Sequence, residues 1–369
     1  MPRPHRLLLV QTQAENAGAQ EISRLLCEQL TARGYEVHQL FFFRRTASFD
    51  NLPLTSFCTM QRPSNPLALA KFFITLFQEY RRIKPDVTLT FQHFGNLLGG
   101  VMARLAGLKN IIANVTSAPL TMNGAVRLAD KLVGTIGVYD KIIVNSKDTL
   151  VEYSAWPQGY QNHLVRIDHG FEDKSVAISK IEARRELGLP EDAVLLGCVA
   201  RLHYLKQLEA NVKLLGENPH WHLGLVGQGP EQDKLVALAR TMGVSDRLHL
   251  LGELPPRKIG VFLASLDVFA FPTLAETFGL AAVEAAQAGI PVVANRLPVL
   301  EEVLEVGGEP CAVFVEAADT KDFAAGVAKV LGDEALRQKL ITGGQQLKQR
   351  YSLSRMIDDY QQVIESVGA

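Results

Sequence analysis

Two glutamates separated by seven residues lie in the segment of this chain whose chemistry is easiest to recognise. The segment covers residues 272–294, PTLAETFGLAAVEAAQAGIPVVA, and the two carboxylates are Glu276 and Glu284. The alanine-rich run between them favours a helix, so we expect Glu276 in a loop and Glu284 in the first turns of the helix. A helix N-terminus suits an anion such as a diphosphate, and flanking carboxylates can accept hydrogen bonds from hydroxyls. This combination fits a nucleotide sugar, whereas the structural alternative is a core helix with two solvated glutamates.

Two cations follow another predicted strand. The segment 196–206 reads LGCVARLHYLK, in which the strand ends at Ala200 and the cations are Arg201 and Lys206. At the carboxyl end of a parallel strand, both would point into the crevice where such sheets bind ligands. Arginine can hold a phosphate through two parallel hydrogen bonds, and lysine acts as a point charge. The pair is a candidate diphosphate clamp, and the alternative is two solvated surface cations.

A glycine pair follows the next predicted strand. The segment 223–233, LGLVGQGPEQD, contains Gly227 and Gly229, but the third glycine of a dinucleotide fingerprint would fall at Gln232. The fingerprint therefore fails, which disfavours a nicotinamide-dependent dehydrogenase. A tight turn between strand and helix explains these glycines equally well.

Taken together, these segments resemble the retaining glycosyltransferases of family four, which have the GT-B fold and a Glu-x7-Glu element. The string ETFGLAAVEAAQAGIPVVA carries most of the resemblance. The segment at 200–206 is similar to the family's G-R-L-x-x-x-K, with Ala200 in place of the usual glycine, and Gly227 and Gly229 match its G-x-G-P. The resemblance covers essentially the whole chain, but its specific motifs lie in the second half.

The resemblance implies a role for each of these residues. Arg201 and Lys206 would stabilise charge on the donor diphosphate, and Glu276 would hold hydroxyls of the donor sugar. The implied donor-binding residues are Glu284 at the ribose, the backbone amides of Phe278, Gly279 and Leu280, Gly229 in the nucleotide pocket, and Gly18 in the first loop. No cofactor and no metal are expected, because the two cations and the helix N-terminus supply positive charge and the sequence contains no Asp-x-Asp motif.

The first half departs from the family pattern in its first loop. In residues 11–21, QTQAENAGAQE, the family typically has two glycines, whereas here Ala17 precedes Gly18. Asn16, with Glu15 and Gln20, is a candidate for the acceptor side. Each of these polar residues is explained equally well as a helix cap or a surface residue.

A second departure concerns a histidine. Family members often carry one after the strand that corresponds to residues 111–115, and Thr116 stands there in this chain. His93, which follows the strand ending at Phe91, is a second candidate for the acceptor side, although a lone histidine is more often structural.

Apolar runs alternate with helix-like segments along the chain, which indicates α/β layers with parallel sheets. In the first half we expect strands at 6–11, 35–43, 86–91, 110–115, 141–145 and 164–167, with helices at 18–33, 66–83 and 99–105. The pattern restarts near residue 182 and supplies further strands at 195–200, 222–226, 248–250, 268–271, 291–294 and 313–314.

The pattern predicts two doubly wound parallel-sheet domains in series, and the resemblance implies that they are Rossmann-like domains of the GT-B fold that face a central cleft. Residues 1–175 would form the acceptor-side domain and 176–350 the donor domain. In the resembled family a final helix, here within 351–369, crosses back to the first domain. The length of 369 residues fits two domains better than one.

Composition excludes several other classes of protein. The formal net charge is −1, so nothing indicates a nucleic-acid binder. The four cysteines are scattered, so we expect reduced thiols in the cytoplasm rather than a disulfide framework or zinc site. The first apolar stretch is too short for a signal peptide, and no run of about 18 apolar residues predicts a membrane span.

Peripheral membrane contact is a separate hypothesis. The segment 71–82, KFFITLFQEYRR, combines Phe72, Phe73, Leu76 and Phe77 with Lys71, Arg81 and Arg82. A core helix is the first explanation, and so is a core strand for the aromatic run 41–43. The alternative is a patch that docks on anionic lipid at the inner face of the cytoplasmic membrane.

The resemblance thus implies a retaining glycosyltransferase of hexosyltransferase type. It would move a sugar from a nucleotide sugar to a hydroxyl of a glycan, lipid-linked or small-molecule acceptor. Cell-envelope polysaccharide, lipopolysaccharide or glycolipid synthesis would be its setting. A sugar-nucleotide 2-epimerase of the same fold, or a non-catalytic nucleotide-sugar-binding homologue, remains open, the latter because of Thr116.

Overall fold

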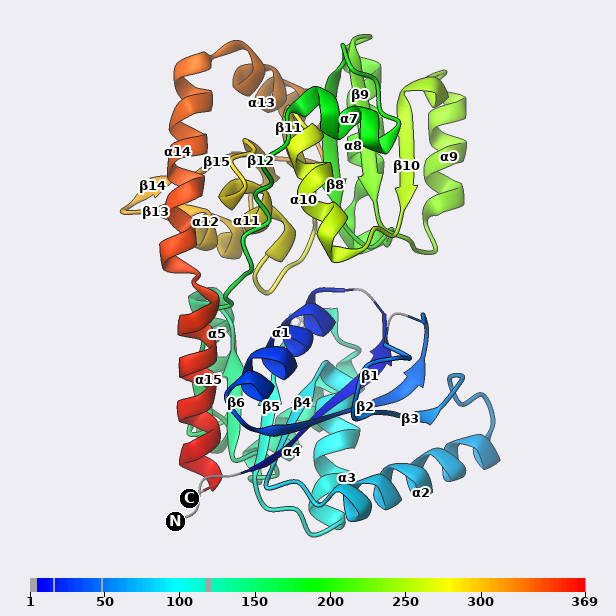
Figure 1. The fold of residues 1–369 in the computed structure, drawn as a ribbon, viewed down its shortest axis with the longest axis vertical. Helices are drawn as coiled ribbons and strands as arrows, with labels where there is room; N and C mark the ends of the chain where they lie inside the picture. Colours follow the sequence, from blue (N-terminus) through cyan, green and yellow to red (C-terminus); the bar gives the residue numbers. More distant parts are fainter. Residues whose placement is uncertain (1–4, 16, 48, 117–120, 369) are drawn as a thin grey trace. The chain divides into compact units, whose positions relative to one another are not determined.

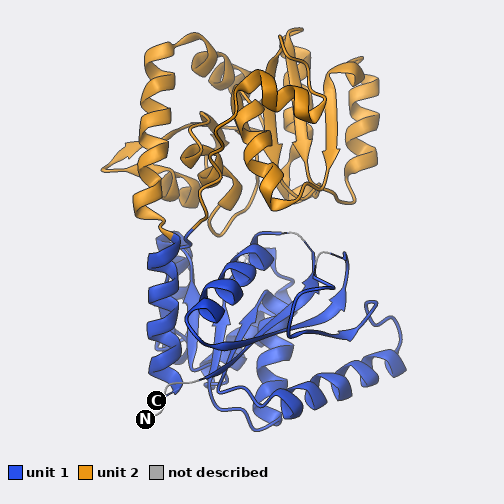
Figure 2. Ribbon diagram, viewed as in Figure 1, with its two compact units in different colours: residues 1–170, 353–369 blue, residues 171–352 orange. Residues whose placement is uncertain are grey.

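The computed structural model describes residues 5–15, 17–47, 49–116 and 121–368. The chain divides into two compact units (Figure 2). Unit 1 comprises residues 1–170 and 353–369, and unit 2 comprises residues 171–352. The sequence-based boundaries, at 175 and 350, lie a few residues away.

A parallel sheet forms the centre of unit 1. Among its described residues the strands are ordered β3-β2-β1-β4-β5-β6-β7, and every neighbouring pair is parallel. The chain adds strands outward from β1 in one direction and then returns to build outward from β4, which is the doubly wound pattern. The strands are β1 (Arg6–Ala14), β2 (Glu36–Arg44), β3 (Thr55–Thr59), β4 (Val87–Phe91), β5 (Ile111–Asn114), β6 (Lys141–Val144) and β7 (Leu164–Arg166).

Helices cover this sheet (Figure 1). They are α1 (Gly18–Ala32), α2 (Pro66–Ile83), the π-helical turn η1 (Gly95–Gly99), α3 (Gly100–Leu105), α4 (Gly124–Thr135), α5 (Lys147–Ser154), α6 (Gln158–Gln161) and α15 (Leu353–Gly368). Leu8 and Val10 of β1 join one core cluster with residues of α2, α3 and α5. Gln11, which alternates with them, donates a hydrogen bond to Ser23 of α1 (2.9 Å), so α1 lies on the opposite face.

Helix α15 follows unit 2 in the sequence but belongs to unit 1. It runs beside the sheet of unit 1 in Figure 1. Its Asp358 forms an ion pair with Arg33, the residue that directly follows α1 (2.6 Å). The buried Tyr360 hydroxyl donates to Asn114 Oδ1 of β5 (2.7 Å). Asn114 in turn donates through Nδ2 to the Thr90 carbonyl of β4 (3.0 Å), so a satisfied polar network locks α15 into this unit.

Unit 2 repeats the architecture. Its described strands are ordered β10-β9-β8-β11-β12-β15, again all parallel, and a short antiparallel pair, β13-β14, stands apart. The strands are β8 (Val194–Val199), β9 (Trp221–Val226), β10 (Leu248–Gly252), β11 (Val268–Phe271), β12 (Val292–Asn295), β13 (Glu305–Val306), β14 (Glu309–Pro310) and β15 (Ala312–Val315). The helices are α7 (Lys180–Leu187), η3 (Tyr204–Lys206), α8 (Leu208–Glu217), α9 (Gln232–Thr241), η4 (Ser245–Arg247), α10 (Pro256–Ser265), α11 (Leu280–Gln287), α12 (Pro298–Val303), α13 (Thr320–Gly332) and α14 (Glu334–Arg350).

The prediction of two doubly wound parallel sheets is confirmed. Helix α2 has the predicted bounds because Asn65 caps its start, Pro66 occupies its first position and Lys84 ends it in a left-handed conformation. Strand β3, helices α4, α5 and α6, and the β13-β14 pair were not predicted. Phe72 and Leu76 of α2 are buried, as are Phe41 and Phe42 of β2, so the core explanation is confirmed for these residues.

Candidate functional site

The centre of the candidate site in unit 2 is an ion pair between Lys206 and Glu276. The two side chains are 70 residues apart in the sequence, yet Lys206 Nζ contacts Glu276 Oε1 and both side chains are largely buried. Lys206 ends the short helix η3 after β8, and Glu276 lies in the loop after β11. The two loops are tied together because Leu274 N donates to the Leu205 carbonyl (2.8 Å) and the buried Thr273 hydroxyl donates to the same oxygen (3.2 Å).

Glycines position the segment that carries Arg201. The backbone N–H of Leu202 donates to the Gln228 carbonyl (3.0 Å). A Cβ atom on Gly227 would lie 2.0 Å from the Ala200 carbonyl oxygen, and one on Gly229 would lie 2.2 Å from that of Leu202. The loops after β8 and β9 therefore approach so closely that only glycine fits, which is a structural reason for the G-x-G-P motif.

Helix α11 begins at a glycine as well. Gly279 has a φ of 89°, and a Cβ there would lie 2.4 Å from Leu300 Cδ2. Phe278 is buried against the rings of Phe171 and Tyr351, so its side chain does not face a ligand. Leu280 opens the helix; the N–H groups of Ala282 and Val283 donate to the Gly279 carbonyl (3.0 and 3.2 Å), so only the N–H groups before Ala282 lie outside the helix's own hydrogen bonds. The predicted donor-binding backbone thus lies at the N-terminus of α11, three residues after Glu276.

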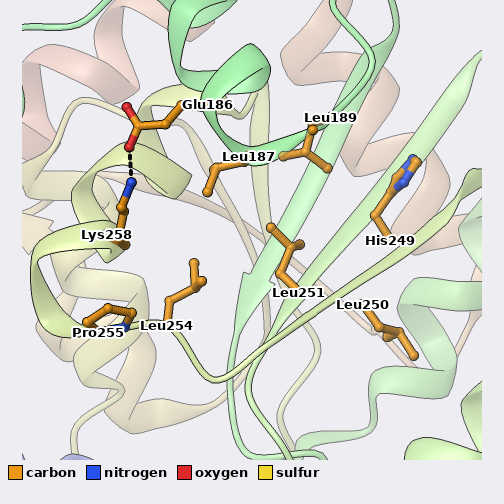
Figure 3. A pocket seen from close by; sticks show the side chains of 10 residues that line it. Glu186, Leu187, Leu189, His249, Leu250, Leu251, Leu254, Pro255 and Lys258 are labelled. Atoms are coloured by element: carbon orange, nitrogen blue, oxygen red, sulfur yellow. Dashed lines mark hydrogen bonds and ion pairs between the residues drawn. The ribbon is translucent and has the colours of Figure 1, made fainter.

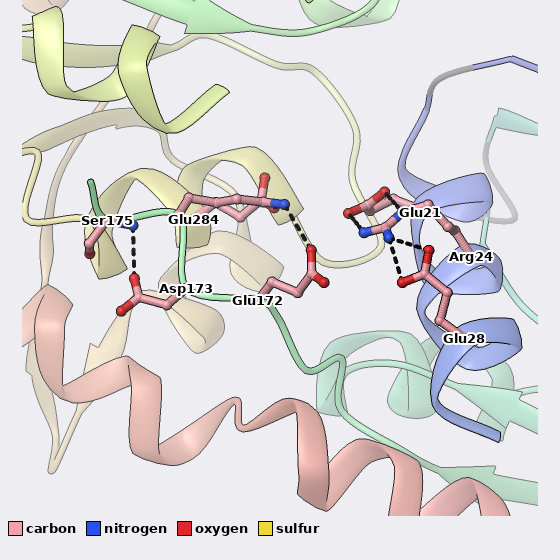
Figure 4. Close-up of polar contacts among 8 residues, drawn as sticks. Glu21, Arg24, Glu28, Glu172, Asp173, Ser175 and Glu284 are labelled. Carbon is pink, nitrogen blue, oxygen red and sulfur yellow. Dashed lines mark hydrogen bonds and ion pairs between the residues drawn. The ribbon is translucent and has the colours of Figure 1, made fainter. Parts of the chain in front are cut away.

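Glu284, in the second turn of α11, faces a cation that sequence reasoning missed. Lys174 Nζ lies 4.0 Å from Glu284 Oε1 and 3.4 Å from Glu172 Oε2 (Figure 4). Only 9% of the Lys174 side chain is exposed, so the ammonium is held between two carboxylates. Gly260 of α10 allows this approach, because a Cβ there would lie 2.4 Å from the Lys174 carbonyl oxygen. The sequence offered no motif for Lys174, only its place in a charged segment.

The predicted acceptor-side residues His93 and Thr116 both follow strands at the carboxyl edge of the sheet in unit 1, after β4 and β5 respectively. Gln92, directly after β4, has a φ of 64°, and its N–H donates to the Thr116 hydroxyl (3.2 Å). Its side-chain oxygen accepts from Thr12 N (3.0 Å). His93 Nδ1 is buried and has no hydrogen-bond partner among the described residues. Burial lowers the pKa of His93, so its ring is neutral at pH 7.

The first loop of unit 1 holds the remaining predicted residues, and two of its polar side chains, Glu15 and Gln20, are buried. Gly18 is exposed and is the first residue of α1, whereas Gln20 is buried and donates to the Gln13 carbonyl (2.8 Å). Glu15 is buried and pairs with Arg45 (3.3 Å). Asn16 lies outside the described residues.

A cavity of about 530 Å³ lies elsewhere in unit 2, between α7, β10 and α10 (Figure 3). Apolar side chains line most of it, and Figure 3 shows Lys258 and Glu186 pairing at one edge. The described lining residues include no predicted site residue. Lys258 and Glu186 neutralise each other's charge. We therefore place the candidate site at the sheet edge that carries Lys206 and Glu276, and not in this cavity.

In the part of the chain that the structure describes, no cluster of three or more His, Cys, Asp or Glu side chains could hold a metal ion. No described helix combines the length and apolar character needed to cross a membrane.

Comparison with known proteins shows which proteins this chain resembles. Residues 179–347 match the family model "Glycosyl transferases group 1". The chain is 35% identical over 167 residues to the D-inositol 3-phosphate glycosyltransferase of Corynebacterium jeikeium, covering 42% of this chain and 39% of that protein. It is 31% identical over 271 residues to the enzyme of the same name from Saccharomonospora viridis, covering 67% and 61%. The chain thus spans about half the length of the curated relatives it matches.

Solved structures resemble the chain over almost its full length. The structure of Anabaena Alr3699/HepE in complex with UDP and glucose has a TM-score of 0.84 at 19% identity, covering 98% of this chain and 99% of that one. WaaG, a glycosyltransferase involved in lipopolysaccharide biosynthesis, has a TM-score of 0.76 at 15% identity, covering 97% and 99%. The fold of this chain is GT-B.

Proposed function

We propose that this chain is a retaining glycosyltransferase that moves a hexose from a nucleoside-diphosphate sugar to an acceptor hydroxyl. The observation that carries the proposal is the Lys206–Glu276 pair, which lies just before the N-terminus of α11 in the region that matches the glycosyltransferase model. A cation, a carboxylate and free backbone N–H groups at one sheet edge are the groups needed to bind a diphosphate together with a sugar.

The reaction breaks the bond between the sugar and the diphosphate and forms one to the acceptor oxygen. The protein must stabilise the negative charge that develops on the leaving diphosphate. Lys206 and Arg201 would do this with the first N–H groups of α11. Glu276 would then accept hydrogen bonds from the donor sugar, and Glu284 from the ribose. We propose that no bound metal is needed, because these groups supply positive charge at the phosphates.

The donor and acceptor classes rest on the relatives. UDP and UDP-glucose occupy the Anabaena structures, so uridine nucleotides are the first donors to test. Relatives named for O-antigen and lipopolysaccharide synthesis support an acceptor in a cell-envelope glycan or glycolipid, at the cytoplasmic face of the membrane. His93 and Thr116 would lie on the acceptor side.

The test is a turnover assay of the purified chain with a panel of nucleotide sugars and candidate acceptors. We expect release of nucleoside diphosphate only when a correct acceptor is present, and NMR should show that the product keeps the anomeric configuration of the donor. Unchanged rates with a chelator would support metal-independent transfer. Inversion of configuration, epimer formation without acceptor, or tight donor binding with no turnover on any acceptor would each contradict the proposal.

A further inference from the structure

Helix α4 presents its large apolar side chains to solvent. Leu128, Leu132 and Ile136, the last directly after the helix, recur every four residues and are 58%, 56% and 75% exposed. Residues at this spacing lie on one side of a helix. The stripe is therefore continuous rather than a scatter of single exposed residues.

The opposite side of α4 holds the helix in an unusual way. Its buried residues are Asp130 and Gly134. Asp130 accepts hydrogen bonds from the hydroxyls of Tyr139 (3.0 Å) and Tyr160 (3.2 Å), and a Cβ on Gly134 would lie 2.3 Å from the Tyr160 ring. The charged residue faces the core and the leucines face outward, which is the reverse of an ordinary surface helix.

Helix α2 and helix α3 add to the same side of unit 1. Leu67, Ile74 and Phe77 of α2 are 81%, 58% and 37% exposed, and Leu105 of α3 is 67% exposed. The inward residues Phe72, Ala103 and Val133, from α2, α3 and α4, contact one common core cluster, so all three helices cover the same face of the sheet. None of the large exposed apolar side chains of the described residues lies on α1 or α15.

We call this set of seven side chains the outer apolar face; it consists of Leu67, Ile74, Phe77, Leu105, Leu128, Leu132 and Ile136. It corrects the sequence-based patch, since Phe72 and Leu76 are core residues. A surface of this kind marks an interaction site in a monomer.

The charges beside the outer apolar face are mostly positive. Residues 60–84 contain five basic residues and one carboxylate, Glu79, which Arg82 neutralises. On α4, Arg127 is exposed, Lys131 is partly exposed, and the helix's carboxylate, Asp130, is buried. Glu152 of α5, which is partly exposed, lies close enough to Arg127 to offset part of its charge. The whole chain carries a net charge of −1, so this positive balance is local.

We propose that the outer apolar face docks on an anionic phospholipid surface. The leucines and phenylalanine would enter the interface, and the cations would approach lipid phosphates. A second copy of this chain would match the apolar side chains but repel through the same cations, whereas an anionic bilayer matches both the apolar side chains and the charge. Docking is independent of the proposed glycosyl transfer and needs neither donor nor acceptor.

The test is co-sedimentation of the full chain with vesicles of phosphatidylcholine, with and without phosphatidylglycerol, at low and high salt. We expect binding only to the anionic vesicles, weakening as salt increases. Leu128→Ser with Leu132→Ser should lower the partition coefficient about tenfold or more. Lys71→Gln with Arg81→Gln should lower it about fivefold for each cation removed.

Matched controls come from unit 2. Ile181→Ser with Val236→Ser removes two exposed apolar side chains, and Lys213→Gln with Lys321→Gln removes two exposed cations. Both control pairs should bind vesicles like the unaltered chain, and all variants should keep its unfolding temperature. Absence of binding to anionic vesicles at low salt would overturn the proposal. So would equal losses in the controls, or a dimer in sedimentation velocity that the Leu128 and Leu132 variant converts to monomer.

Discussion

The two units share one topology but differ in how their sheet edges are built. In unit 2, charged side chains from distant loops meet as an ion pair, Lys206 with Glu276, and glycines bring the supporting backbones together. In unit 1 the corresponding edge is uncharged where β4 and β5 end, with Thr116 bonded to Gln92 N and His93 neutral at pH 7, although an ion pair, Glu15 with Arg45, lies where β1 and β2 end. A diphosphate demands fixed charges in a fixed arrangement, whereas an acceptor hydroxyl makes no such demand. A charged edge is therefore easier to recognise in a sequence than a neutral one.

The largest expected effect is a loss of turnover when the charged sheet edge of unit 2 loses a cation. Lys206→Ala removes a cation beside the proposed diphosphate, and one such donor is worth about a hundred- to a thousandfold in kcat. We expect that loss in a steady-state assay, with Lys213→Ala, on the exposed side of α8, as the control. A folded Lys206→Ala protein with normal turnover would show that the charged edge does not serve catalysis.

The second prediction concerns the glycines that support this edge. Gly229→Ala would force a Cβ against the Leu202 carbonyl, so unit 2 should lose about 1–3 kcal/mol of unfolding free energy. Gly332→Ala is the control, since nothing lies within 4 Å of its added Cβ. Urea unfolding measures both variants. Equal stability would mean that the two loops move apart at little cost.

The third prediction concerns unit 1, where burial raises the pKa of Asp130 to about 6. The folded state then holds the proton more tightly than the unfolded chain, whose aspartate pKa is about 3.9. Its stabilising contribution is present below about pH 4 and is lost as pH rises through 6, a change of roughly 1–3 kcal/mol. Asp130→Asn should remove this change from the curve of stability against pH. The idea fails if the variant and the unaltered chain keep parallel curves between pH 4 and 7.

The smallest expected effect is on ligand binding, and it distinguishes the roles of Glu276 and Glu284 in unit 2. Glu284→Ala should weaken binding of free UDP about tenfold, as expected for a lost charged hydrogen bond, and Glu276→Ala should mainly weaken binding of the complete nucleotide sugar. Calorimetric titration of both ligands distinguishes the two. The reverse pattern would exchange the roles of the two carboxylates.

The sequence predicted what short-range patterns control. Alternating apolar runs located both parallel sheets, and the cap at Asn65 with Pro66 located α2. Helix α4 was missed because its buried positions are Asp130 and Gly134, so its apolar residues do not mark an inward face. Strand β3 was missed because five residues, TSFCT, carry too little periodicity.

The same distinction holds for the site residues: local motifs were predictable from the sequence, and contacts between distant segments were not. Lys206 and Glu276 were predicted one by one from local motifs, but their contact was not, because it depends on how two loops 70 residues apart are tied at Leu205. Lys174 belongs to no motif, and its place beside Glu284 depends on a close approach to Gly260. Such contacts arise from tertiary packing and leave no spacing rule in the sequence.

The place of α15 in unit 1 has a consequence for biosynthesis. Unit 2 is one continuous stretch, 171–352, so it can fold as soon as that stretch has left the ribosome. Unit 1 starts to emerge first, yet the partner of Asn114, Tyr360, is translated only after all of unit 2. Unit 1 is therefore synthesised first but finishes folding last. Until α15 has been translated, the surface of unit 1 that α15 covers is exposed on the nascent chain, where a chaperone could bind it.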